Sequence, residues 1–241
     1  MGRAHEVRKQ SMAKTSLEKS ILNARASKEI YMAAKQGGTD PNANLALRSM
    51  IDKAKAKKVS SETIARAIKK AEGGSEENYL PGKFEGFFSS GIMIIVDTLT
   101  NNVNRAAANV KMVFKKNDAK IGIPGSVSHF FSNISLFRFK YHNYNELWEK
   151  LINCNVEFND LKSHEEGIIT LIGKFEQFNN IQKFLQSEGI TNFIESETTV
   201  IPNDYLEIQN EEILEAFKKF LSDLENDEDV QSVYHNVKYL D

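Results

Sequence analysis

Apolar residues recur at helical spacing through the first 70 residues, in three runs separated by glycines or short polar turns. The first run predicts a helix from Met12 to Gln36, ended by the glycines that follow it. The second begins at Asp40-Pro41, which reads as an aspartate N-cap followed by a proline at the first helical position. Ser60 caps the third. We expect these helices to pack as a small bundle, with residues 1–11 forming a flexible basic arm in front of it.

Past a glycine-containing linker at 73–82, the pattern changes to that of strands. Three strands and one helix are expected next: strands at 83–88, 92–99 and 126–131, and a helix starting at Asn101 or Asn102. Residues 135–202 then follow the order strand, helix, strand, strand, helix, strand, which is that of a ferredoxin-like unit. A last helix at 209–225 and a strand at 230–237 have no sheet of their own. We expect them to complete the sheet of residues 83–131.

These elements predict an α+β protein. It consists of an N-terminal three-helix bundle followed by two α/β (ferredoxin-like) domains, the middle one completed by the C-terminal helix and strand. The predicted domains are a basic helical domain at 1–76, a discontinuous α/β domain at 77–134 plus 203–241, and a ferredoxin-like domain at 135–202.

Charge is distributed unevenly along the chain, although the net charge is only −2. Residues 1–70 hold 16 Lys and Arg against 6 Asp and Glu, a balance of +10, and the remaining residues carry −12. Such segregation bears on partners rather than on fold. The basic end is suited to a polyanion, which the acidic remainder should repel.

Composition also restricts the compartment. No apolar run approaches the roughly 18 residues of a membrane span, and the polar N-terminus lacks the apolar segment of a secretory signal. Cys154 is the single cysteine, so a disulfide framework is not expected. We therefore expect a cytoplasmic protein without a membrane partner.

Motifs for catalysis or cofactor binding are missing from the sequence: it has no Walker A loop, GxGxxG, HExxH, GxSxG or CxxC. The five histidines lack ligand spacing. Asp227-Glu228-Asp229 could hold a hard cation, but it lacks the glycine and spacing of an EF-hand loop and is interpreted as a solvated acidic loop. We expect no enzyme activity, no catalytic residue, no metal, no cofactor and no small-molecule substrate.

The positive chemical signal is a set of cations on the predicted bundle and its arm. Cations near helix C-termini are partly ordinary helix design, but few acids are interleaved with these. Aromatic residues suited to stacking single-stranded bases are lacking. The predicted nucleic-acid-binding residues are Arg3, Arg8, Lys9, Arg48, Lys53, Lys57, Lys58, Arg66, Lys69 and Lys70.

Several stretches resemble the YebC/PmpR family, which includes the mitochondrial translational activator of cytochrome oxidase. They occur in family order across essentially the whole chain. The stretches are Gly37–Asn44, Leu47-Arg48, Ile51–Lys55, Ile64–Lys70, Tyr79, Phe84–Gly86, Ile95–Arg105, Gly125–Ser128 and Leu224–Asn236. One departure is the arm, where the family's Lys-Trp-x-Asn-Ile segment is replaced by residues 3–8.

The resemblance implies a three-domain fold without enzyme activity and leaves two functions open. Members are described as probable transcriptional regulators that bind DNA, and others as ribosome-associated factors that assist translation through proline-rich stretches. Both would rest on phosphate contacts, with duplex DNA or ribosomal RNA as the partner. Ser61, Glu62 and Thr63 at the start of the third helix are poorly suited to reading bases, which need Arg, Asn or Gln there. DNA binding in transcription regulation is the first hypothesis, and ribosome association is the alternative.

Overall fold

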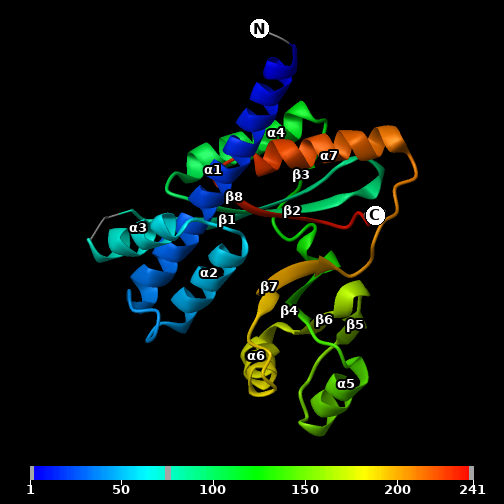
Figure 1. Ribbon diagram of the computed structural model, residues 1–241. Helices are drawn as coiled ribbons and strands as arrows, with labels where there is room; N and C mark the ends of the chain where they lie inside the picture. The colour runs from blue at the N-terminus through cyan, green and yellow to red at the C-terminus, as the bar shows by residue number, and fades with distance from the viewer. Residues whose placement is uncertain (1–2, 74–76, 239–241) are drawn as a thin grey trace. The chain divides into compact units, whose positions relative to one another are not determined.

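The chain forms two compact units, Met1–His129 with Asp204–Asp241 and Phe130–Asn203. The structure is a computed structural model that describes residues 3–73 and 77–238, with only the backbone described for residues 3–14 (Figure 1). The predicted α+β class is confirmed, because a region of three helices precedes two antiparallel sheets that each carry helices.

Three helices make up the N-terminal region: α1 (Arg3–Gly37), α2 (Leu45–Ala56) and α3 (Ser61–Glu72). Their apolar stripes meet in one core, in which Ile30, Leu47 and Ala67 are at most 1% exposed. Ser60 caps α3 as predicted, since its side chain accepts a hydrogen bond from the Thr63 amide.

Two expectations about these helices are wrong. Helix α1 starts at Arg3 instead of following an irregular arm, because residues 3–11 contain no glycine or proline and several strong helix formers. Helix α2 begins at Leu45, later than Asp40-Pro41 suggested. The buried Asn44 caps it by accepting from the Leu47 amide, and donates to the carbonyls of Ala33 and Gly38 at 2.8 Å each. One side chain thus ends α1 and starts α2.

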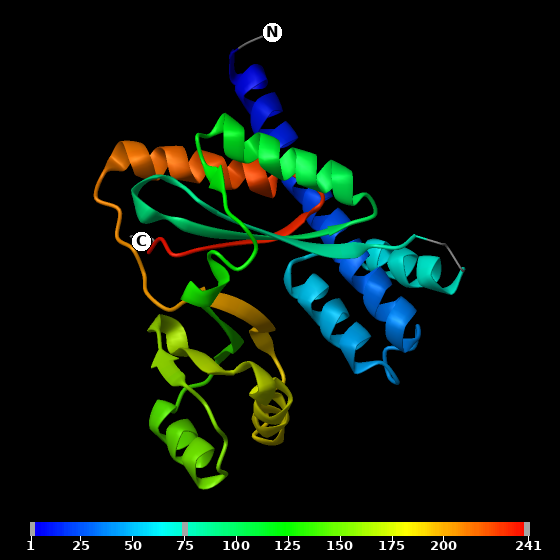
Figure 2. The same cartoon turned by 180° about the vertical axis from the view of Figure 1, so that it is seen from behind.

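The sheet of the first unit is assembled from two separate parts of the chain, in the order β3-β1-β2-β8 with all pairs antiparallel. Its strands are β1 (Leu80–Phe87), β2 (Met93–Thr100), β3 (Lys120–Ile121) and β8 (Val230–His235). Helices α4 (Val103–Lys116) and α7 (Glu211–Glu225) cover one face (Figures 1 and 2). The predicted completion by the C-terminal helix and strand is confirmed by the pairing of β8 with β2.

The strand predicted at 126–131 does not form. The chain instead makes a short 3-10 helix, η2 (Ser128–Phe130), and enters β4 only at Phe131. The Glu85 carboxylate accepts hydrogen bonds from the amides of Gly125, Val127 and Ser128, so those amides cannot join a strand ladder.

The second unit has the ferredoxin-like strand order β5-β6-β4-β7, with all neighbours antiparallel. Helices α5 and α6 pack on one face of its sheet around Phe137, Leu147 and Ile181. The elements are β4 (Phe131–Lys140), α5 (Tyr144–Asn153), β5 (Asp160–Ser163), β6 (Ile168–Lys174), α6 (Phe178–Ser187) and β7 (Phe193–Pro202). This unit also has two 3-10 turns, η3 (Glu165–Gly167) and η4 (Phe175–Gln177), and the first unit has another, η1 (Ser89–Gly91). None of the helices in the described part of the chain has the length and apolarity that crossing a membrane requires.

Aromatic packing between the helices and the sheet should make α7 essential for stability. Phe220 is fully buried, lies edge-on to Phe114 at 5.0 Å between ring centroids, and stacks on Phe88 at 5.3 Å. Phe220→Ala should lower the free energy of unfolding by about 3–5 kcal/mol, the usual cost of such a cavity. Urea denaturation checks this, with the exposed neighbour Lys219→Ala as control. Equal stability of the two variants would contradict the packing.

Candidate nucleic-acid interface

The predicted cations of the bundle lie around the end of α2 and along α3. Lys57 is the C-cap of α2, and Lys58 follows it in the left-handed conformation with φ of 60°. Both side chains are exposed, as is Lys69 in the last turn of α3. Because α3 has 12 residues, its two ends are about 18 Å apart at a rise of 1.5 Å per residue. Lys57 and Lys58 precede the N-terminal end of α3, and Lys69 lies near its C-terminal end.

Several of the predicted cations are already engaged. Arg48 donates to the Asn42 side-chain oxygen at 2.9 Å, and Lys53 lies 3.7 Å from the Glu29 carboxylate. The two remaining ion pairs join Arg66 to Glu62 and Lys70 to Glu77. No ion pair is found for Lys57, Lys58 or Lys69 within the residues that the structure describes. We call these three the open cations; Lys55 of α2, which is not among the predicted binding residues, is also exposed.

The predicted contacts of the arm fall on the first three turns of α1. Arg3, Arg8 and Lys9 lie there, where the structure describes the backbone but not the side chains. Their assignment to nucleic-acid binding stays a prediction.

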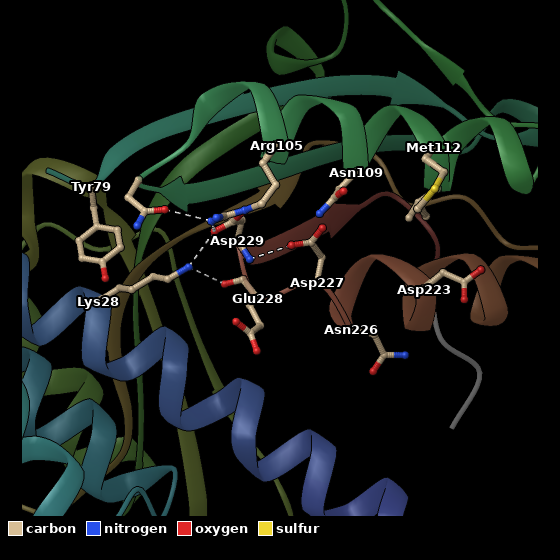
Figure 3. Close-up of a pocket in the computed structure, with 12 residues that line it drawn as sticks. Lys28, Tyr79, Arg105, Asn109, Met112, Asp223, Asn226, Asp227, Glu228 and Asp229 are labelled. Atoms are coloured by element: carbon tan, nitrogen blue, oxygen red, sulfur yellow. Dashed lines mark hydrogen bonds and ion pairs between the residues drawn. The ribbon is translucent and has the colours of Figure 1, made fainter. Parts of the chain in front are cut away.

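The bundle is fastened to the neighbouring sheet through one carboxylate, that of Asp229 (Figure 3). Asp229 is 2% exposed. Arg105 of α4 donates to both of its oxygens, at 2.8 Å from Nε and 2.9 Å from Nη2. Lys28 of α1 donates to Oδ1 at 2.9 Å. The Asp229 carbonyl also accepts from the Leu99 amide at 2.8 Å, so the cluster joins α1, α4, β2 and the start of β8.

Two cations of α1 reach carbonyl groups beside this carboxylate. Lys28 donates to the carbonyls of Leu99, at 3.1 Å, and Glu228, at 2.8 Å, so all three of its ammonium hydrogens have acceptors. Arg25 donates to the carbonyl of Glu225 at 2.7 Å, at the C-terminal end of α7, where the helix dipole favours a cation. Helix α1 is thereby held at two of its successive turns.

The linker after α3 is held to α1 as well. The Tyr31 hydroxyl and the Lys35 ammonium donate to the carbonyl of Glu77, at 2.9 and 3.2 Å. The Glu77 side chain accepts from Lys70 and from the Tyr79 hydroxyl, both at 2.6 Å, and these bonds lower its pKa. These contacts join Glu77 of the 73–82 linker to α1 and α3. The Lys70 ammonium is thereby paired with the Glu77 carboxylate.

Asp229 corrects the interpretation of 227–229 as a solvated acidic loop. Burial alone would raise the pKa of its carboxyl, but the hydrogen bonds from Arg105 and Lys28 outweigh burial and lower it. Sequence reasoning missed this role because a short acidic run after a helix usually faces water. Arg105 and Asp229 do fall within the stretches that carry the family resemblance, whereas Lys28 had no such signal.

A cleft of about 650 Å³ opens beside the Asp229 cluster (Figure 3). Its lining holds two cations, Lys28 and Arg105, against four carboxylates, so it is acidic and unsuited to a phosphate. The lining residues are Lys28, Tyr79, Asn101, Arg105, Asn109, Met112, Val113, Asp223, Asn226, Asp227, Glu228 and Asp229. Among the described residues, no three His, Cys, Asp or Glu side chains gather as a metal site.

A second buried carboxylate, Glu85, anchors the segment that leads to β4. Besides the three amides, it accepts from the Ser128 hydroxyl, at distances of 2.5–3.0 Å in all. Burial would raise the pKa of the Glu85 carboxyl, yet the four hydrogen bonds together lower it to about 2. Only the ionised form can accept all four bonds.

Comparison with known proteins covers nearly the whole chain. A family model described as the TACO1/YebC protein N-terminal domain matches residues 3–74, and one described as the TACO1/YebC second and third domain matches 80–237. A protein of Mesoplasma florum named "Probable transcriptional regulatory protein Mfl546" is 48% identical over 98% of this chain and 99% of its own. A "Probable transcriptional regulatory protein" of Shewanella oneidensis is 40% identical over the full length of both chains. The crystal structure of a conserved hypothetical protein, Aq1575 from Aquifex aeolicus, superposes with a TM-score of 0.76 at 29% identity, covering 91% of this chain and 90% of that one.

Removing the Asp229 charge should loosen the first unit. In Asp229→Asn the shape is kept, but Lys28, whose side chain is 12% exposed, loses its counter-ion. We expect the free energy of unfolding to fall by about 2–3 kcal/mol, at or below the usual cost of breaking a buried pair because half-exposed Arg105 can turn to water. Urea denaturation measures the loss. The exposed neighbour Glu228→Gln is the control, and an Asp229→Asn variant as stable as this control would overturn the role of the carboxylate.

Glu85 should contribute an acid-sensitive part of the stability. Its pKa of about 2 lies below the ordinary 4.5, so its stabilisation is complete above pH 4.5 and is lost as the pH falls toward 2. At about 1.4 kcal/mol per pKa unit the full effect is about 3 kcal/mol. The stability difference between the wild type and Glu85→Gln, measured by denaturation at several pH values, should therefore shrink as the pH drops from 5 to 2. A difference that does not change with pH would contradict the assignment.

Proposed function

Because the chain belongs to the TACO1/YebC family, we propose that it is a nucleic-acid-binding regulator of gene expression that holds duplex DNA by its phosphates. The observation that carries this proposal is the set of open cations on the bundle, Lys57, Lys58 and Lys69, which are exposed and have no ion pair among the described residues. The relatives are named probable transcriptional regulatory proteins, which supports a regulatory role.

Lys58 occupies the turn that ends α2, in the left-handed conformation. In the left-handed backbone conformation, a residue other than glycine is destabilised by roughly 1–2 kcal/mol. Helices commonly end on a glycine in this conformation. Lys58 has a φ of 60°, and the amide of Val59 bonds back to the Ala54 carbonyl. The same conformation occurs at Ser90, Asp118, Asn155 and Glu166. It therefore does not by itself indicate a function; at Lys58 it leaves an exposed ammonium in the turn between α2 and α3.

The start of α3 argues for contacts to the backbone of the nucleic acid over contacts to bases. Glu62 lies in its first turn and is ion-paired to Arg66 one turn later. A carboxylate there is repelled by phosphates, and the arginine that could reach a guanine is engaged. We infer binding that tolerates different sequences, because phosphate contacts position a protein without specifying bases.

Ribosomal RNA is the second candidate partner, and the same first turn of α3 favours it. A protein bound to the ribosome has no need of a base-reading helix, and lysine contacts to phosphate serve RNA as well as DNA. If duplex DNA is the partner, removing the open cations should lower the affinity for DNA. If ribosomal RNA is the partner, the same change should lower the affinity for ribosomes.

A triple variant tests the proposal. Lys57→Ala, Lys58→Gly and Lys69→Ala together remove the open cations, and glycine relieves the strain at position 58, so folding should be kept. If each cation contacts one phosphate, the slope of log K against log salt should flatten by about 2.7, at about 0.9 per contact. Fluorescence anisotropy of a labelled duplex across a salt series measures this.

The matched control removes the same charge elsewhere, through Lys140→Ala, Lys183→Ala and Lys219→Ala, three exposed cations for which the described residues offer no ion pair. A triple variant that matches this control on duplex DNA and also still cosediments with ribosomes would refute phosphate binding by the bundle. Loss of ribosome association with unchanged DNA binding would refute the DNA proposal in favour of ribosomal RNA.

A further inference from the structure

Helix α4 departs from the acidic character of the chain beyond residue 70. Its 14 residues contain no Asp or Glu and four cations. Even its first turn, where the helix dipole favours a carboxylate, has none. The acidic balance of this part of the chain therefore does not extend to α4.

The exposed side chains of α4 divide between two stripes. On the side of α4 that lines the cleft, Arg105 is bound to Asp229, and at the other end of the helix Lys116 lies 3.1 Å from the Asp223 carboxylate. The outer stripe consists of Asn104, Ala108, Lys111 and Lys115, all of them exposed. Their spacing of four, three and four residues places them in one line along the helix.

The outer stripe lies away from the helix core. The buried residues of α4 are Ala106, Val110, Val113 and Phe114, and most of them pack against the sheet and α7. At about 100° per residue, the line through Asn104 and Lys111 lies about 125° around the helix from the middle of these residues. No ion pair is found for Lys111 or Lys115 among the residues described.

We propose that this outer stripe of α4 is a second contact surface for the phosphate backbone of the duplex DNA that the bundle holds, an inference that rests on the proposed function. Lysine ammonium groups attract phosphate as point charges, and the Asn104 amide can donate a hydrogen bond to a phosphate oxygen. The short side chain of Ala108 leaves room for a strand to lie close to the helix. From Asn104 to Lys115 the stripe runs about 16 Å at 1.5 Å per residue, enough to follow several successive phosphates.

The Asp229 cluster gives this surface its continuity with the bundle. Lys28 of α1 and Arg105 of α4 bind the same carboxylate, and Asn104 directly precedes Arg105. The start of the stripe is thus fixed next to α1.

Helix stability alone does not explain the two lysines of the stripe. Lys115 lies in the last turn, where a cation complements the helix dipole. Lys111 lies four residues before it, and like charges at this spacing destabilise a helix. Alanines stand three and four residues before Lys111, at the positions where a glutamate would pair with it. A surface selected only for stability would carry a carboxylate there, and its absence leaves both charges to an external anion.

The test is the double variant Lys111→Ala with Lys115→Ala, in the full-length protein. Fluorescence anisotropy with a labelled mixed-sequence DNA duplex should give a salt slope flatter by about 1.8, at about 0.9 per lost contact. The control is Lys140→Ala with Lys183→Ala, two exposed cations of the second unit, which changes the net charge equally. We expect the control to keep the slope of the wild type, because charge at a distance is screened by salt.

The outcomes separate this inference from the proposed function. If the α4 variant behaves as its control while the triple variant of the bundle loses slope, the second surface is refuted and the function stands. If neither variant differs from its control, both are refuted. If the α4 variant loses ribosome association but keeps its DNA slope, the stripe serves RNA and the inference as stated is wrong. Thermal unfolding of both α4 and control variants should match the wild type, since all four lysines are exposed.

Discussion

The arrangement of the first unit depends on the shared carboxylate of Asp229. Two cations from helices far apart in the sequence, Lys28 and Arg105, bind it, and its own backbone is paired to β2. A buried charge of this kind is tolerated only when its hydrogen bonds are satisfied, so each partner constrains the others. The helical bundle is consequently a part of the first unit, held against the sheet, even though a linker joins the two in sequence.

This constraint changes the meaning of the charge segregation. Cations at Lys28, Arg105 and Lys70 hold the fold together, because each has a carboxylate partner. Those without such a partner among the described residues, on the bundle and on the outer stripe of α4, remain available to a polyanion. Net charge along the sequence counts paired and open cations alike. It therefore overestimates the positive charge that the bundle offers to a polyanion and underestimates the positive charge that α4 offers.

Periodicity predicted the strand order of the second unit and the return of the C-terminus to the first sheet, because both follow from local patterns and from unpaired apolar faces. It failed where a single polar side chain decides the backbone. Asn44 delays α2, and Glu85 turns residues 125–128 away from a strand. The role of Asp229 could not be predicted for a related reason. Its partners lie about 125 and 200 residues away in the sequence, and no local pattern reports a contact at that separation.

Contact between nucleic acid and two basic surfaces of the first unit is the central claim. Photo-crosslinking of the full-length protein to a duplex DNA, followed by peptide mapping, tests it most directly. The account predicts crosslinks in peptides that span 48–70 and 104–115, and none in 130–203. Crosslinks confined to the second unit, or spread evenly over all exposed lysines, would contradict it.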